Sequence, residues 1–301
     1  MIQLILRILR NRNTILVLAV AAGMIFGEYT SFVENYTIYA LGIVMLVSTT
    51  GISIKSLVPF KNTLMAFGTG ILFNYIIFSS VALLLGMLMF PLNAYFMGVV
   101  VIAFSPPGIA VIPFTQILKG NENYTILATL GSYLAAVIIL PWIFGLFPGN
   151  EALQRTDILL FLVNVIVIPI ILSRMLLLKP IKPFVQKHRG RVTDWGFAFI
   201  IFVAVGLNRH VFFEFSPVLI KSVFLIIALT FGLGSVYNWL NRRFKWVDEK
   251  TEVSQNLLLT IKSSGFTATT SLALFGKEAA VPSAVMAVMI LVYLIFLAIK
   301  K

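Results

Sequence analysis

Apolar segments separated by short polar stretches run along the whole chain. There are ten, at residues 14–30, 38–55, 63–90, 94–118, 123–146, 156–178, 194–210, 217–240, 253–275 and 279–299. A helix needs about 20 mostly apolar residues to cross the hydrocarbon core of a bilayer, and most of the segments reach that length. The pattern predicts an all-α polytopic membrane protein with ten transmembrane helices.

The composition narrows the class of protein further. Of the 301 residues, 59% are hydrophobic and only 11% are charged, whereas about a quarter of a soluble domain is charged. So few charges cannot cover a water-facing surface of normal size. This excludes a soluble enzyme, a disordered chain and a secreted disulfide-rich domain. The chain has no cysteine, which also excludes thiolate metal sites and cysteine nucleophiles.

The net charge of +12 follows the predicted topology. With the N-terminus inside, 18 Lys and Arg residues fall in inside segments and four in outside segments, and Lys262 remains within a span. Cytoplasmic loops of membrane proteins carry such an excess of Lys and Arg. We therefore expect a multi-pass protein of the inner (plasma) membrane with both termini cytoplasmic. The charge then needs no nucleic-acid partner.

Short motifs recur at nearly constant spacing. Gly51-Ile52-Ser53-Ile54-Lys55 ends the second segment, and Gly206-Leu207-Asn208-Arg209-His210 ends the seventh, at an offset of 155. Gly120-Asn121-Glu122 and Gly276-Lys277-Glu278 open the fifth and tenth, at an offset of 156. The spacing predicts two repeats, residues 1–150 and 151–301. With five spans each they must be inverted, as in many secondary transporters.

Two segments in corresponding positions are interrupted near their middle. The fourth contains Ser105-Pro106-Pro107-Gly108, and the ninth contains Lys262-Ser263-Ser264-Gly265. Proline has no N–H and clashes with the preceding turn of a helix. Paired interruptions favour broken helices that expose backbone at the midplane, where transporters bind substrates and ions. A simple packing kink is the alternative.

The interrupted segments resemble those of the bile acid:sodium symporter family. The turn at residues 105–108, followed by Lys119-Gly120-Asn121, is similar to the family's Pro-Gly-Gly turn and Lys/Arg-Gly-Asn/Asp turn. Residues 262–265 resemble its Gln-Asn-Ser-Gly stretch, and residues 51–54 its Gly-Leu-x-Leu ending of span two. Auxin-efflux-type and arsenite carriers share this fold, but arsenite carriers depend on a cysteine.

The resemblance implies an architecture and a place for the substrate. Helices 1, 2, 6 and 7 would form a panel, and helices 3–5 and 8–10 a core. Broken helices 4 and 9 would cross within the core. The substrate would lie in the crevice between core and panel, beside the crossing.

The family's sodium ligands can be carried over one position at a time. Its Ser-Asn pair falls on Val111 and Ile112, and its Glu in span nine falls on Leu258, so these three side chains supply no oxygen. Its Gln in the same span falls on Lys262. Three positions keep a side-chain oxygen: Asn74, Thr125 and Thr129. Because hard cations need several oxygen ligands and compensating negative charge, the resemblance predicts degraded sodium sites and no bound metal.

Lys262 is the only charged residue predicted at midplane depth, since all eleven acids lie in loops or at span ends. A lysine at the centre of a membrane helix costs about 2.5–3.5 kcal/mol on insertion scales. We expect oxygens to offset this cost, from free carbonyls at the breaks and from the side chains of Asn74, Thr125, Thr129, Ser263 and Ser264. Lys262 would then replace the bound cation. It either exchanges a proton during transport or stays charged and pairs with an anion; a lysine that snorkels to the interface is the alternative.

These features predict a secondary active transporter of a small organic anion, bile-acid-like, keto-acid-like or related. It would work by alternating access, independently of sodium and with protons as the candidate coupling ion. The alternative is a non-transporting receptor or sensor that keeps the fold. An enzyme is not expected, because the middle of the predicted spans offers no acid, base or nucleophile beyond Lys262. No cofactor is expected, and the expected partners are the lipid bilayer and the anion.

Overall fold

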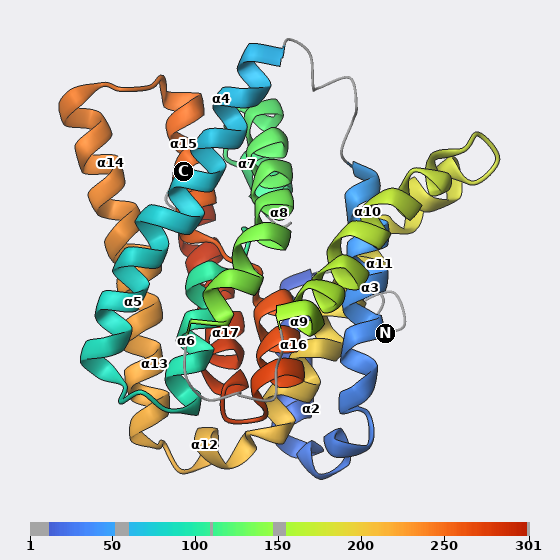
Figure 1. Cartoon of the computed structure of the whole chain (residues 1–301), viewed down its shortest axis with the longest axis vertical. Helices are drawn as coiled ribbons and strands as arrows, with labels where there is room; N and C mark the ends of the chain where they lie inside the picture. The colour runs from blue at the N-terminus through green and yellow to red at the C-terminus, as the bar shows by residue number, and fades with distance from the viewer. Residues whose placement is uncertain (1–11, 52–59, 109–110, 147–154, 300–301) are drawn as a thin grey trace.

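The computed structural model describes residues 12–51, 60–108, 111–146 and 155–299 (Figure 1). All regular elements in these ranges are helices. Residues 52–55 of the span-two motif, and the basic residues near both ends of the chain (residues 1–11 and 300–301), lie outside the described ranges.

Most helices overlap the apolar segments expected from the sequence, but some extend beyond them: α11 begins at Lys182, twelve residues before the expected segment 194–210, and α15 begins at Glu249, four residues before the segment 253–275. The first half contains α2 (Arg12–Ile25), α3 (Thr37–Ser48), α4 (Phe60–Ile71), η5 (Leu72–Ile77), α5 (Phe78–Met89), α6 (Ala94–Phe104), α7 (Val111–Ile117) and α8 (Glu122–Phe144). The second contains α9 (Arg155–Leu162), η6 (Val163–Val167), α10 (Ile168–Ser173), α11 (Lys182–Leu207), α12 (Arg209–Phe213), α13 (Pro217–Ile227), η8 (Ala228–Gly232), α14 (Leu233–Phe244), α15 (Glu249–Thr260), α16 (Ser264–Phe275) and α17 (Ala280–Ile299). The short 3₁₀ turns are η1 (Gly27–Phe32), η2 (Glu34–Tyr36), η3 (Thr49–Gly51) and η7 (Met175–Leu177).

Several of these helices can cross a membrane unaided. Among the described residues, five continuous helices are long and apolar enough: Thr63–Met89, Glu122–Phe144, Arg155–Leu177, Lys182–Leu207 and Pro217–Phe244. Shorter apolar helices, such as Ala94–Phe104, lie between them. The chain is therefore a polytopic helical membrane protein. The number of ten crossings and the side on which the termini lie stay predictions.

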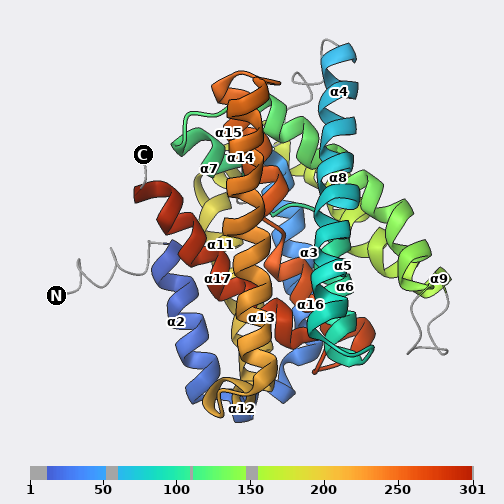
Figure 2. The ribbon, with the colours of Figure 1, turned by 90° about the vertical axis from the view of Figure 1, so that its left-hand side faces the viewer.

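The helices pack in two groups. On one side α11 packs against α2 and α3, and α3 also contacts α10. On the other side α17 packs against α6, α13 and α16, while α8 packs against α4. The groups meet where α16 contacts α3 and α11, and where α8 contacts α9. Figure 1 shows α13 and α14 at the left edge and α3 and α10 at the right, and Figure 2 views the molecule from the α13–α14 side.

Irregular turns occur at corresponding places in the two halves. The third and eighth spans each contain a π-helical segment, η5 and η8, whose first residues are Leu72 and Ala228. Their separation of 156 residues equals the offset of one sequence motif. π-Helical turns are rare in proteins, and those that occur are often found at functional sites. A third such segment, η6, has no counterpart in α2, so the correspondence supports the repeat only in part, and the inverted repeat stays a prediction.

Candidate functional site: the crossing of two broken helices

The sequence explains why α6 ends where it does. A residue before proline is pushed out of the helical region, and Ser105 is extended with φ −68° and ψ 150°. Pro106 and Pro107 follow and cannot donate to the preceding turn. In the ninth span, α16 begins after Ser263, whose hydroxyl accepts a hydrogen bond from the Phe266 amide at 3.4 Å.

The two interrupted segments cross and bind each other through their backbones. Pro107 and Lys262 form an antiparallel bridge. The Gly108 amide donates to the Ile261 carbonyl at 3.0 Å, and the Ser263 amide donates to the Pro106 carbonyl at 3.1 Å. A Cβ atom on Gly108 would lie 3.0 Å from the Lys262 carbonyl oxygen. The absence of a side chain at residue 108 therefore permits this close approach of the two chains.

The side chain of Lys262 extends from this crossing toward α6 and η5. The side chain is buried, with 2% of the residue exposed. Its ammonium nitrogen donates to the Ser105 carbonyl at 2.7 Å and the Ala103 carbonyl at 3.3 Å. It also lies 3.0 Å from the side-chain oxygen and 3.1 Å from the backbone oxygen of Asn74. The ammonium is thus surrounded by four oxygen acceptors.

Aromatic rings complete the surroundings of the ammonium. Its nitrogen lies 4.3 Å from the centre of the Phe78 ring and 5.8 Å from that of Tyr75. The negative face of an aromatic ring attracts a cation at such distances. No carboxylate among the described residues lies within ion-pair distance of Lys262. Dipoles and ring faces, rather than a counter-ion, stabilise this charge.

Local backbone structure supplies the free carbonyls. The last carbonyls of a helix have no partner within it, and the C-terminal end of a helix favours cations. Ala103 belongs to the last turn of α6, and Ser105 follows its end. Asn74 lies in the π-helical turn of η5. The broken helix and the π-helical turn together create the binding place for the ammonium.

A second set of hydrogen bonds orients these oxygens. The Asn74 side-chain nitrogen donates to the Gly70 carbonyl at 2.9 Å and approaches the Ser132 hydroxyl at 3.4 Å. This fixes the amide so that its oxygen faces Lys262. The Ser79 hydroxyl contacts the carbonyls of Asn74 and Ala103, at 2.8 Å each. The sequence reasoning missed Ser79 and Ser132, although a polar residue in an apolar membrane segment is a usable signal.

The other predicted residues lie near the crossing but do not bind the ammonium. The Thr125 hydroxyl contacts the Thr115 hydroxyl at 3.1 Å and the Asn121 carbonyl at 3.1 Å. Gly265 packs against α11, where a Cβ atom would lie 2.4 Å from the Phe197 ring. No hydrogen bond to the Lys262 ammonium from Thr125, Thr129, Ser263 or Ser264 occurs in the described part of the chain.

The positions that correspond to sodium ligands are poor in oxygen. Val111 and Leu258 are fully buried apolar side chains, and Ile112 lies at the edge of a small cavity. The Lys262 ammonium takes the free oxygens at the crossing. Hard cations require several oxygen ligands with compensating negative charge, and the side chains of Val111, Ile112 and Leu258 supply no oxygen.

The small cavity lies between the two groups of helices. It has a volume of about 10 Å³, which is about the minimum that holds one water molecule. Its lining residues are Ser48, Thr49, Ile112, Thr129, Leu130, Tyr133 and Ile170. Two of these hydroxyls, on Thr129 and Tyr133, are buried and make no hydrogen bond of normal geometry, although the Ser263 side chain lies near the Tyr133 hydroxyl. Thr193, Ser222, Thr269 and Thr270 also carry unpaired hydroxyls, but they do not line this cavity. The cavity is the candidate for the substrate crevice that the family resemblance implies.

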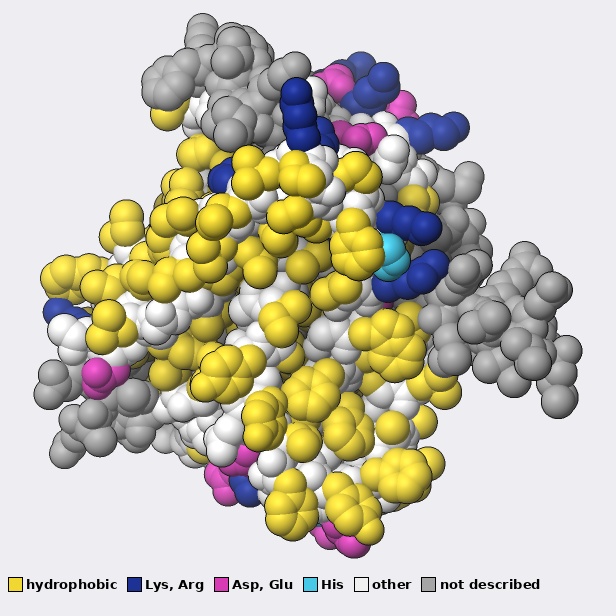
Figure 3. Space-filling model, turned by 90° about the vertical axis from the view of Figure 1, so that its right-hand side faces the viewer, with side chains coloured by type: hydrophobic (Ala, Val, Ile, Leu, Met, Phe, Trp, Pro, Cys, Tyr) yellow, Lys and Arg dark blue, Asp and Glu magenta, His cyan; other side chains and the backbone are white. Residues whose placement is uncertain are grey.

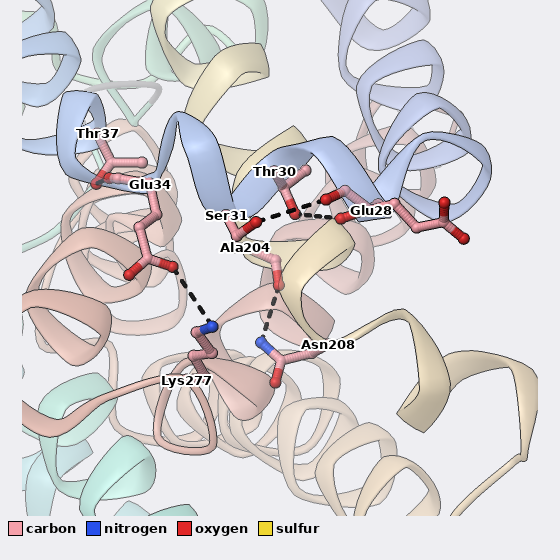
Figure 4. Close-up of polar contacts among 9 residues, drawn as sticks. Glu28, Thr30, Ser31, Glu34, Thr37, Ala204, Asn208 and Lys277 are labelled. Carbon is pink, nitrogen blue, oxygen red and sulfur yellow. Dashed lines mark hydrogen bonds and ion pairs between the residues drawn. The ribbon is translucent and has the colours of Figure 1, made fainter.

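Away from the crossing, two ion pairs join distant segments, and Figure 4 shows the one between Glu34 and Lys277. Glu34 in η2 lies 3.8 Å from Lys277, in the turn between α16 and α17. Glu28 in η1 lies 2.7 Å from Arg209 in α12. The first pair connects the α2–α3 connection to the group of helices that contains the crossing.

Comparison with known proteins places these features in a family. No curated protein sequence matches the chain. A sequence model of the sodium bile acid symporter family matches residues 38–215. This stretch is more than half of the chain and contains the α6–α7 break, but ends before α15. The role of Lys262 therefore has to be argued from the geometry of the crossing. The match itself confirms the resemblance seen in the sequence: the chain belongs to the sodium bile acid symporter family.

Proposed function

We propose that the chain is a sodium-independent secondary transporter of a small organic anion, in which Lys262 replaces a bound cation. Membership of the family makes the chain a membrane transporter of organic anions or similar compounds. The observation that supports the finer assignment is the Lys262 ammonium, buried at the helix crossing among four oxygens.

The surroundings of Lys262 favour its charged form in this conformation. An ammonium group has three N–H donors and no acceptor. All four of its hydrogen-bonding neighbours are oxygen acceptors. The lone pair of a neutral amine would find no donor here. Proton coupling therefore requires a second conformation in which Lys262 leaves some of these oxygens; a fixed charge requires none.

The crevice supports an anionic substrate that binds beside the crossing. Thr129 and Tyr133 offer hydroxyl donors without partners. On the other wall of the crevice, the Arg174 guanidinium donates to the Thr49 carbonyl and places a second positive charge nearby. Alternating access would follow if helices 1, 2, 6 and 7 moved as a panel against the core and opened this crevice to each side in turn.

Uptake into proteoliposomes tests the proposal. Candidate anions, including bile acids and keto acids, are supplied in sodium buffer and in choline buffer across a range of pH. We expect equal uptake in both buffers, and loss of uptake or a changed pH profile in Lys262→Gln. The matched control is Lys221→Gln, which removes an exposed lysine of α13. Strong stimulation by sodium, or full uptake with an unchanged pH profile in Lys262→Gln, would overturn the proposal. Binding without uptake would favour the receptor alternative.

The proposed topology has its own test in a chain without native cysteine. Single cysteines are introduced at residues 31–36 and at residues 182–189. We expect impermeant reagents to label the first set from outside and the second from inside. Labelling of both sets from the same side would contradict the topology.

A further inference from the structure

An apolar groove lies on the face of the molecule opposite α13 and α14. It is formed by α3 and α11, and its volume is about 410 Å³. The lining residues are Ala40, Ile43, Arg191, Val192, Trp195, Gly196 and Phe199. A Cβ atom on Gly196 would lie 2.3 Å from a methyl group of Val44. The two helices therefore touch at Gly196, and this contact forms the floor of the groove.

The groove changes character along α11. Arg191, Trp195 and Phe199 follow one another at intervals of four residues and share one face of the helix. They span about 12 Å along the helix axis, at 1.5 Å per residue. The groove is thus cationic at one end and apolar over the rest, and Trp195 is half exposed between the two parts.

Further basic residues lie at the cationic end. Lys182, Lys187 and Arg189 belong to the first turns of α11 and are exposed. No carboxylate among the described residues forms an ion pair with Arg191; the nearest acid along the helix is Asp194. Figure 3 shows basic side chains and a histidine close together on this face, next to many exposed hydrophobic side chains.

We propose that this groove binds an anionic phospholipid. One acyl chain lies along Val192, Trp195 and Phe199, and the phosphate contacts the guanidinium of Arg191. The groove already faces lipid in a membrane-spanning helix, and the cation at its end matches the charge and depth of a phospholipid headgroup. With the proposed topology, the lipid belongs to the cytoplasmic leaflet, whose anionic lipids attract basic segments next to a span.

The test uses lipids with brominated acyl chains, which quench tryptophan fluorescence on contact. In a variant whose only tryptophan is Trp195, brominated phosphatidylglycerol should quench at lower mole fraction than brominated phosphatidylcholine. A nearby Lys or Arg contributes enough to change this preference about fivefold. Arg191→Gln should therefore reduce the preference by about that factor. Native mass spectrometry of the unmodified protein should detect retained phosphatidylglycerol.

A matched control exists in α14, where Trp239 is exposed and Arg242 lies one turn further on. In a variant whose only tryptophan is Trp239, Arg191→Gln should leave the quenching unchanged. Equal quenching of Trp195 by both headgroups would overturn the proposal. The proposal would also be overturned if neither lipid quenched Trp195 and cysteines introduced at residues 40 and 199 crosslinked two copies of the chain. A second protein copy would then cover the groove.

Discussion

The helix crossing and the crevice are both buried and polar, but they treat their polar groups in opposite ways. At the crossing, the side chains of Lys262 and Asn74 have hydrogen-bond partners. In the crevice, the hydroxyls of Thr129 and Tyr133 have none. A buried polar group without a partner costs about 1–3 kcal/mol. The crossing is therefore built for stability, whereas the crevice retains a cost that a bound ligand can offset.

The largest expected effect is at the crossing. Lys262→Met removes the donor for four oxygens and keeps a side chain of similar length. We expect the free energy of unfolding to fall by about 3 kcal/mol, since hydrogen bonds to charged groups contribute about 1.5–3 kcal/mol. Lys262→Gln keeps amide donors, so its free energy of unfolding should decrease by a smaller amount. Thermal unfolding in detergent measures both, and a Met variant as stable as the unmodified chain would remove the distinction between the two regions.

Substitutions in the crevice should change stability in the opposite direction. Thr129→Val and Tyr133→Phe remove hydroxyls that lack partners, so each should leave stability unchanged or raise it by about 1 kcal/mol. Transport should nevertheless weaken, with a raised KM for the anion. Thr125→Val is the matched control, because its hydroxyl is hydrogen-bonded and its loss should lower stability. Destabilisation of all three variants alike would contradict this assignment of the crevice.

The sequence predicted well those features that depend on local composition, and missed those that depend on contacts between distant segments. Long apolar segments and paired interruptions depend on local composition, so the helical membrane fold, the family and the position of both breaks were readable from the chain. The backbone partners of Lys262 were not, because the carbonyls of Ala103 and Ser105 have no sequence signal of their own. Only the combination of a helix end and the η5 turn brings them to one point. The groove beside Arg191 likewise needed the packing of α3 on α11.

A smaller effect on stability is expected at the start of α15, the helix that ends just before Lys262. Asp248 is the N-cap residue, and its carboxylate accepts hydrogen bonds from the Lys250 and Thr251 amides at 3.1 and 3.3 Å. The Thr251 hydroxyl, followed by these amides, lowers the pKa of Asp248 below its ordinary value. Its stabilisation is therefore present above the ordinary pKa and is lost as the pH falls through the lowered one. Asp248→Ala should cost about 1 kcal/mol at neutral pH, and thermal unfolding of this variant should depend less on pH in the acidic range.

The smallest effect on stability, but an informative one, is expected at the ion pair between Glu34 and Lys277. Ion pairs of exposed side chains contribute about 0–1 kcal/mol, and Lys277 is 54% exposed. Glu34→Gln should thus leave the unfolding temperature almost unchanged. Because the pair joins the α2–α3 connection to the α16–α17 turn, its loss should favour separation of these segments, and a cysteine at Ser31 should react faster with an impermeant reagent. The double variant Glu34→Lys/Lys277→Glu restores attraction and should return the labelling rate to that of the single Ser31→Cys protein. If the Ser31 cysteine in Glu34→Gln reacts no faster, the ion pair does not hold the two groups of helices together. Opening of the crevice would then have to be controlled by another contact.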